Sequence, residues 1–153
     1  MSKKEWGNAT WYLFHTLAEK IDEKYYLENK KTFFKIIELI CTHLPCPTCA
    51  EDSINLLKNA NINAISSKET LKLFFFEFHN KVNHKLGKQI FEQDILSKYK
   101  LARTQNIIIN FLNKYFVHQY NEKLMIFNYN KSQIEGTLKS YLYALMQNGW
   151  VQI

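Results

Sequence analysis

Two cysteines separated by two residues, Cys46 and Cys49, are the side chains in this sequence best suited to chemistry. Pro47 lies between them, and a proline suits the first turn of a helix because its missing N–H would be unpaired there in any case. Both sulfur atoms would then lie within one helical turn, close enough to form a disulfide. The partial positive charge of a helix N-terminus stabilises a thiolate and lowers the pKa of a cysteine. The pair is therefore suited to exchanging electrons between dithiol and disulfide forms.

Two other interpretations of the pair stay open. Zinc could be bound by the closely spaced Cys41, His43, Cys46 and Cys49, although no second C-x-x-C and no H-x-x-x-H motif completes a tetrahedral set. A purely structural disulfide is the other alternative, but one that closes so short a loop restricts the unfolded chain very little. Cys41 continues an apolar helix face, so we expect it to be a buried free thiol, with an interchain disulfide as the minor alternative. The cysteines alone favour a redox-active pair.

The segments that would position these cysteines have the patterns of helices. Four Gly and two Pro in 153 residues leave little material for tight turns, and no strand pairs are visible. The predicted helices cover 6–22, with Asn8 as the N-cap, and then 28–44, 47–59, 68–86, 91–99, 104–123 and 131–148. A capping box at 66–69 would open the helix that stops at Gly87. The sequence therefore predicts an all-α bundle followed by a helical C-terminal extension.

Charge and hydropathy exclude several classes of protein. The net charge is +6, but the lysines are interleaved with Glu and Asp, so no block is dense enough for a nucleic-acid or membrane patch. No apolar run is long enough to span a bilayer, and residues 1–5 lead into no apolar segment typical of a secretory signal. We therefore expect a soluble protein, without a metal ion, whose thiol chemistry takes place without secretion.

A strip of amide and imidazole side chains runs along the helix predicted at 68–86. His79 and Asn83 are four residues apart and share one face, next to the apolar Val82. Asparagine is a mediocre helix former, and neither Asn80 nor Asn83 has a capping position. Each residue alone is most simply part of a solvated face. Together they form a half-buried polar strip, which needs hydrogen-bond partners from the protein or from a ligand.

A group of aromatic residues lies near the N-terminus. Trp6, Trp11 and His15 fall on one side of the first predicted helix and would form a flat surface with a hydrogen-bonding end. Such a stripe belongs to the hydrophobic core more often than to a cofactor site, and the presence of two tryptophans with a histidine favours a cofactor site only slightly more. Lys85 and Lys88 could neutralise a pyrophosphate, although surface lysines are the simpler explanation.

Taken in order, these segments resemble the Erv/ALR family of FAD-dependent sulfhydryl oxidases. The stretches that carry the resemblance are WGNATW at 6–11 with His15 and Ala18, LPCPTCAED at 44–52, and HNKVN at 79–83 with LGK at 86–88. The resemblance covers about residues 5–100 and implies a four-helix bundle with a short fifth helix over 1–100. FAD would be held at the mouth of this bundle, with its isoalloxazine ring beside the cysteine pair. Residues 101–153 would form a helical extension packed on or beside the bundle.

The resemblance also implies roles for individual residues. Cys49 would lie next to the flavin and form a thiolate–flavin charge-transfer pair, and Cys46 would be the interchange thiol that meets the substrate. The residues expected to contact FAD are Trp6, Trp11, His15, Cys49, His79, Asn80, Val82, Asn83, Lys85, Leu86 and Lys88, with Tyr99 as the candidate for the aromatic residue near the adenine. The implied reaction takes electrons from a dithiol through Cys46 and Cys49 to FAD and then to dioxygen, which gives hydrogen peroxide.

The sequence departs from the family in its cysteines and its C-terminus. Cellular members carry a second, shuttle cysteine pair, and no such pair is present among the three cysteines here. Electrons would therefore come from dithiol client proteins or from a separate thioredoxin-like or C-x-x-C shuttle protein. The apolar faces of 101–153 would either pack on the bundle or form a dimer surface or docking site, and a homodimer is expected. The short form is similar to versions in large cytoplasmic DNA viruses, which points to the host cytoplasm or the virion, with the mitochondrial intermembrane space as the alternative.

Two functions of other classes compete with this interpretation. A zinc-stabilised interaction module would carry stoichiometric zinc and no flavin. A non-catalytic helical adaptor would bind flavin and yet turn over no thiol substrate.

Overall fold

The computed structural model describes residues 3–116 and 125–153, without the side chains of 126 and 127. The helices are α1 (Lys3–Lys20), α2 (Glu23–Glu28), α3 (Lys30–Thr42), α4 (Pro47–Lys58), α5 (Lys68–Lys85), α6 (Thr104–Tyr115) and α7 (Met125–Gln147), with the 3-10 helices η1 (Ile62–Ala64) and η2 (Gln93–Leu101). In this described part the only extended pairing is an isolated bridge between Ile21 and Val151. The predicted all-α class is confirmed.

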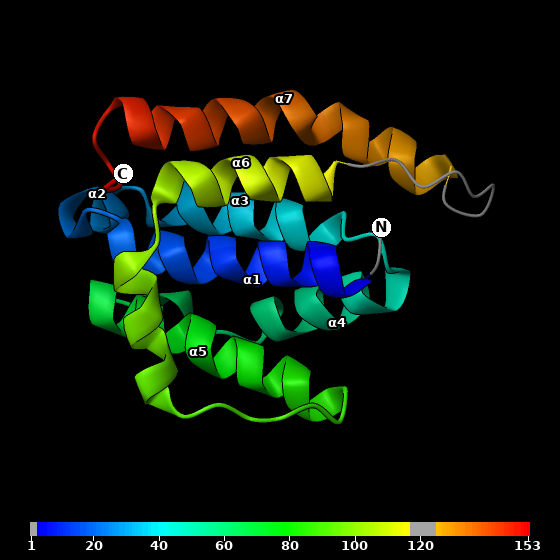
Figure 1. Ribbon diagram of the computed structural model, residues 1–153, viewed down its shortest axis with the longest axis horizontal. Helices are drawn as coiled ribbons and strands as arrows, with labels where there is room; N and C mark the ends of the chain where they lie inside the picture. Colours follow the sequence, from blue (N-terminus) through cyan, green and yellow to red (C-terminus); the bar gives the residue numbers. More distant parts are fainter. Residues whose placement is uncertain (1–2, 117–124) are drawn as a thin grey trace.

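Helix α1 is the centre of the molecule, with α6 along one side and α5 along the other (Figure 1). It is buried on most of its circumference, and Leu13 and Leu17 are completely inaccessible. Burying a leucine side chain contributes about 1.5–3 kcal/mol, so this helix anchors the surrounding ones. No helix in the described ranges is long and apolar enough to cross a membrane.

The start of α1 corrects one prediction. Asn8 is not an N-cap, because the helix begins at Lys3 and Asn8 lies in its second turn. Trp6 is buried in the core, at 6% exposure, and its packing stabilises the turn that precedes Asn8. Tertiary burial here overrides a local capping preference.

The segment between α1 and α4 holds a helix that the sequence analysis missed. The six-residue α2 is capped by Asp22, whose carboxylate accepts a hydrogen bond from Tyr25 N at 2.9 Å. Asn29 then separates α2 from α3, so the predicted helix over 28–44 is shorter, and it ends at Thr42, ahead of Pro45. The predicted short helix at 91–99 is the run of 3-10 turns η2.

Both ends of α5 are set by local signals. Ser67 is the N-cap, but its capping-box partner is Thr70 and not Glu69 as the box at 66–69 implied. Gly87 follows the C-cap with φ 67°, a left-handed conformation that favours glycine. Gly87 N donates to His84 O and Lys88 N to Asn83 O, the bonding pattern of a Schellman motif.

The C-terminal helices cover the bundle. Phe111 and Tyr115 of α6 and Leu142 of α7 are completely buried in the same core cluster as α1 and α3. The Tyr115 hydroxyl donates to Ile40 O of α3 at 2.8 Å. Helix α7 begins earlier than predicted, at Met125, and residues 117–123 of the predicted helix 104–123 lie outside the described ranges. The buried apolar side chains of α6 and α7 therefore pack within the chain, while others such as Ile109 and Tyr143 stay exposed.

Candidate active site

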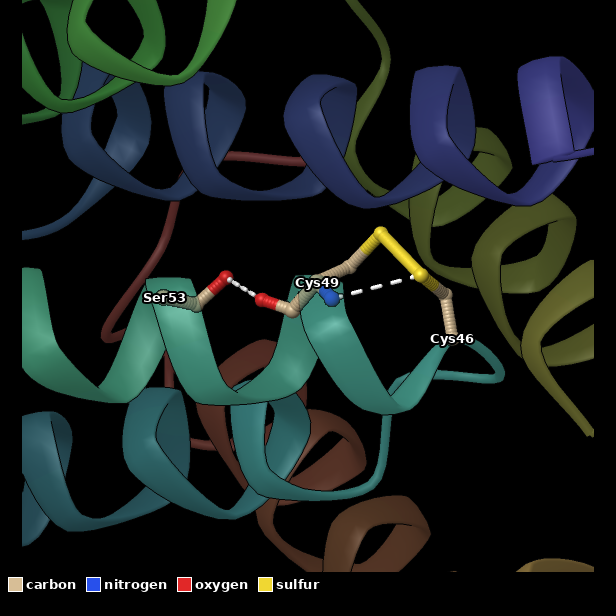
Figure 2. Close-up of a disulfide and its surroundings, with 3 residues drawn as sticks. All are labelled: Cys46, Cys49 and Ser53. Atoms are coloured by element: carbon tan, nitrogen blue, oxygen red, sulfur yellow. Dashed lines mark hydrogen bonds between the residues drawn. A yellow bond between two sulfur atoms is a disulfide. The ribbon is translucent and has the colours of Figure 1, made fainter. Parts of the chain in front are cut away.

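Cys46 and Cys49 form a disulfide at the start of α4 (Figure 2). Cys46 is the N-cap, Pro47 is the first helical residue, and the two Cα atoms are 5.1 Å apart. Cys49 N donates to Cys46 Sγ at 3.2 Å, and Ser53 Oγ donates to Cys49 O at 2.7 Å. Both cysteines are half-buried. The sulfur of Cys46 thus lies where the unpaired N–H groups of the first helical turn are concentrated.

A cavity of about 370 Å³ lies beside this disulfide, between α1, α4, α5 and the chain that leads into η2. Its size falls in the range typical of small-molecule and cofactor sites. Cys49 lines the cavity, whereas Cys46 does not. The two cysteines therefore differ in their surroundings, because Cys49 adjoins the cavity and Cys46 does not.

Aromatic rings form one wall of the cavity. The rings of Trp11 and His79 are stacked, with centroids 4.0 Å apart and planes 10° from parallel. Phe78 meets Trp11 edge-on at 5.4 Å, and Tyr99 packs edge-on against Tyr12 at 5.3 Å. Flat faces of this kind suit a planar aromatic ligand.

The two histidines of the site lie within hydrogen-bonding distance of each other, and their burial favours the neutral form of both. His15 Nε2 and His79 Nδ1 are 3.0 Å apart, within hydrogen-bonding distance. The pKa of His15 is lowered to about 3 and that of His79 to about 4, mainly by burial, and the positive charge of Lys98 contributes to both shifts. His15 lies behind His79, stacked on Tyr99 at 4.7 Å, and its Nδ1 has no partner among the residues described.

Lysines outnumber acids around the cavity. Lys85 forms an ion pair of 3.1 Å with Asp52, the acidic residue of the lining. Lys98 Nζ lies 5.2 Å from the ring centroid of Tyr99 and 5.0 Å from that of Tyr12. The lining lysines are Lys3, Lys4, Lys85, Lys88 and Lys98. This excess of positive charge suits an anionic ligand such as a pyrophosphate.

The structure brings most of the residues expected at the cofactor into the lining of this cavity. They are Trp6, Trp11, Cys49, His79, Val82, Asn83, Lys85, Leu86, Lys88 and Tyr99. His15 and Asn80 are not in the lining: His15 is behind His79, and the side chain of Asn80 is bonded to the backbone of Phe91. Whether each of these side chains contacts FAD stays a prediction.

Several lining residues were not predicted from the sequence. Gly7 is one, and its signal was a glycine inside a helical pattern, which costs stability unless something needs the space. Tyr12 directly follows Trp11 but was not considered. Phe91 and Lys98 carried no signal, because the path of the chain after α5 decides where they lie.

The third cysteine, Cys41, is a free and buried thiol, as predicted. Burial raises its pKa well above the usual range, and Cys41 is one of the residues that line the cavity. Within the described ranges no group of three or more His, Cys, Asp or Glu is placed to hold a metal ion.

Comparison with known proteins gives a family match over most of this region. A model of the Erv1 / Alr family matches residues 8–104. A relative from Invertebrate iridescent virus 3 is 32% identical over 100 residues, which are 64% of this chain and 68% of that protein. No solved structure matches the chain.

Two further relatives are named FAD-linked sulfhydryl oxidases. The one from African swine fever virus is 26% identical over 111 residues, covering 67% of this chain and 92% of the relative. The Arabidopsis thaliana protein, FAD-linked sulfhydryl oxidase ERV1, is 32% identical over 91 residues, 60% of this chain but 47% of the relative. The chain therefore spans about half the length of the plant relative.

Proposed function

The chain belongs to the Erv1 / Alr family, and from that premise we propose that it is an FAD-dependent thiol oxidase. It would form disulfides in client proteins or in a small redox partner, with dioxygen as the final electron acceptor and hydrogen peroxide as the product. The observation that carries the proposal is the position of the Cys46–Cys49 disulfide at a helix N-terminus, with Cys49 opening onto an aromatic, lysine-rich cavity.

The donor set of the cavity fits FAD. The aromatic wall that Trp11, Phe78 and His79 form suits a flavin or adenine ring, and the lysines suit the two negative charges of the pyrophosphate. At Gly7 a side chain would meet nothing within 4 Å, which leaves open space beside the backbone of α1. The residues proposed to hold FAD are Trp6, Trp11, Cys49, His79, Val82, Asn83, Lys85, Leu86, Lys88, Lys98 and Tyr99. When bound, FAD would supply the acceptor for the electron pair of the reduced cysteines and the chemistry that reaches dioxygen, which amino-acid side chains do not provide.

The chemistry of the chain begins at Cys46. A thiolate of the substrate attacks Cys46 Sγ, the Cys46–Cys49 bond breaks, and Cys49 leaves as a thiolate that faces the cavity. The positive end of α4 and the nearby lysines stabilise that negative charge. The second thiol of the substrate then attacks the substrate sulfur of the mixed disulfide, and Cys46 leaves as a thiolate. The substrate has lost two electrons and two protons, and the reduced cysteine pair holds the two electrons, for which FAD bound beside Cys49 would be the acceptor.

The substrate side of the reaction requires a separate dithiol. These 153 residues hold only three cysteines, and Cys41 is buried, so no second pair is available in them to relay electrons. We propose that the donor is a client protein or a small C-x-x-C protein that reaches the half-buried Cys46. No nucleic acid and no membrane insertion is part of this proposal.

Domain limits, location and assembly are part of the same proposal. Residues 1–100 form the FAD-binding bundle and 101–153 the extension that covers α1 and α3. The matching viral relatives favour a virus-encoded protein acting in the host cytoplasm or the virion, and the relative from Schizosaccharomyces pombe, named mitochondrial, keeps the intermembrane space as the alternative. A homodimer would need a surface other than the face of α1 that α6 occupies, because Phe111 and Leu112 are buried there.

Purified protein tests the proposal directly. We expect a yellow protein with a flavin absorption spectrum that consumes oxygen when dithiothreitol is added. Cys46→Ser and Cys49→Ser should each abolish turnover while retaining flavin, which shows that the site itself is intact. Stoichiometric zinc without flavin would support the interaction module instead, and bound flavin without thiol turnover would support the adaptor.

A further inference from the structure

The chain between α5 and η2 forms one wall of the cavity although it is exposed along its whole length. Lys88, Gln89 and Phe91 all line the cavity, and every residue over 86–92 is exposed to solvent. An exposed loop of this kind has few apolar contacts to fix its path. Something else must therefore hold it against the site.

Two amide side chains of α5 hold this loop by its backbone. Asn80 Nδ2 donates to Phe91 O at 3.0 Å, and Phe91 N donates to Asn80 Oδ1 at 3.0 Å. The Asn80 amide thus pairs with one peptide residue through both of its polar groups. Asn83 Nδ2 adds a third bond, to Gln89 O at 3.2 Å. The backbone of the loop thus supplies the hydrogen-bond partners that the two mid-helix asparagines need.

Asn80 does not line the cavity, although its neighbour His79 does. The Asn80 side chain borders a shallow groove on the outer side of the loop, together with Leu56, Lys81 and Ile90, and it is not part of the cavity lining. Asn83 differs, because it is buried at 6% exposure and does line the cavity. The route by which Asn80 would affect a bound ligand is therefore the loop that it holds.

We propose that Asn80 is a positioning residue, which clamps the backbone at Phe91 so that the loop stays closed against the FAD site. This inference rests on the proposed function for the identity of the ligand. The clamp itself involves only residues of this chain. Its consequence is that apoprotein is already in the shape that binds FAD, and the loop does not have to be ordered during binding.

The size of the effect follows from the number of bonds lost. Removing both hydrogen bonds of Asn80 frees the loop to leave the closed arrangement, and the apparent dissociation constant rises in inverse proportion to the fraction of molecules that stay closed. Two neutral hydrogen bonds, each of ordinary net strength, correspond to a rise of about 5-fold to 100-fold. The helix and the core are untouched, so the thermal stability of apoprotein should change little.

Two variants and a control separate the clamp from direct contact with the ligand. Asn80→Ala removes both bonds, whereas Asn80→Asp keeps the acceptor for Phe91 N and loses the donor to Phe91 O. Lys81→Ala is the matched control, because Lys81 is the exposed neighbour on the same groove and lies outside the cavity lining. FAD affinity is measured by titrating apoprotein and following flavin fluorescence. Loop opening is measured without any ligand, by the rate of tryptic cleavage after Lys88 in apoprotein.

We expect Asn80→Ala to weaken FAD binding by about 5-fold to 100-fold and to accelerate cleavage after Lys88, with Asn80→Asp between it and the control. Equal cleavage rates in Asn80→Ala and Lys81→Ala would overturn the clamp. Weaker binding with unchanged cleavage would overturn it too, since Asn80 would then act on FAD directly. If unaltered apoprotein binds no FAD, the proposed function fails, while the cleavage experiment still decides whether Asn80 holds the loop.

Discussion

Replacing Gly7 by alanine should affect the free protein and the FAD complex in opposite directions. Gly7 lies inside α1, lines the cavity, and does not have a positive φ. A Cβ added there meets no atom within 4 Å, so alanine fits without strain. Glycine inside a helix is destabilising by roughly 0.5–1 kcal/mol relative to alanine, so Gly7→Ala should stabilise apoprotein by about that amount.

The same methyl group should weaken FAD binding. It projects beside the backbone of a helix that lines the cavity, into space that a bound FAD would occupy under the proposed function. The expected stabilisation of apoprotein by 0.5–1 kcal/mol corresponds, for a chain of this length, to a rise in Tm of about 1–4 °C, measured by thermal denaturation. FAD affinity, measured by fluorescence titration, should fall by about 10-fold, equivalent to roughly 1.4 kcal/mol.

Gly136→Ala is the matched control for this experiment. Gly136 lies inside α7, also has nothing within 4 Å of an added Cβ, and is absent from the cavity lining. Both variants should raise the Tm of apoprotein, but only Gly7→Ala should weaken FAD binding. If Gly7→Ala bound FAD as tightly as Gly136→Ala, the ligand would not approach α1 at this point. A lower Tm for apo Gly7→Ala would show that the added methyl group clashes with the protein, and so that the space beside Gly7 is not open.

Three further results are expected. Phe111→Ala should lower the free energy of unfolding by about 3–5 kcal/mol in urea denaturation, because Phe111 is completely buried between the extension and the bundle; a loss below about 1 kcal/mol would mean that α6 is not part of the core. Burial holds the pKa of His15 at about 3 and that of His79 at about 4, below the usual value of ~6.5 for a histidine. Below pH ~6.5 the unfolded chain therefore binds more protons than the folded chain. The free energy of unfolding should fall by on the order of several kcal/mol as the pH drops from ~6.5 to about 4. A pH-independent free energy over that range would show that these imidazoles are charged or exposed. Iodoacetamide should label no thiol of the native disulfide form and one, Cys41, after unfolding, because burial raises the pKa of that thiol; rapid native labelling in a mass spectrum would disprove its burial.

The features that the sequence predicted correctly are those determined by neighbouring residues. Pro47 fixes the start of α4, which places Cys46 at the N-cap and Cys49 one turn later. Gly87 ends α5 through a left-handed conformation that few other residues adopt. These signals do not depend on the rest of the fold, so they can be predicted before the fold is known.

The features that the sequence did not predict depend on tertiary packing. Asn8 has the right residue type for an N-cap, but burial of Trp6 carries the helix past it. The short helix α2 exists because Asp22 caps it and its tyrosines, Tyr25 and Tyr26, are buried against neighbouring elements. An isolated six-residue helix is not stable in water, so periodicity alone gives no strong signal for it.

The residues of the candidate site also fall into those that local sequence patterns predict and those that depend on tertiary structure. Trp11 and His79 were found because helical spacing puts each on the inner face of its own helix. The sequence could not show that Asn80, one residue after His79, turns outward to the backbone of Phe91. Nor could it place Lys98, which reaches the cavity through the path of the loop and of η2.

The absorption spectrum of each cysteine variant tests the central claim most directly. The claim is that FAD fills the cavity and that Cys49, which lines it, is the cysteine beside the flavin, whereas Cys46 meets the substrate. Cys46→Ser leaves Cys49 as a free thiolate next to the flavin, so the purified variant should show an added long-wavelength absorption band. Cys49→Ser should bind flavin without that band. The band in Cys49→Ser and not in Cys46→Ser would reverse the two roles, and a colourless protein would contradict the account as a whole.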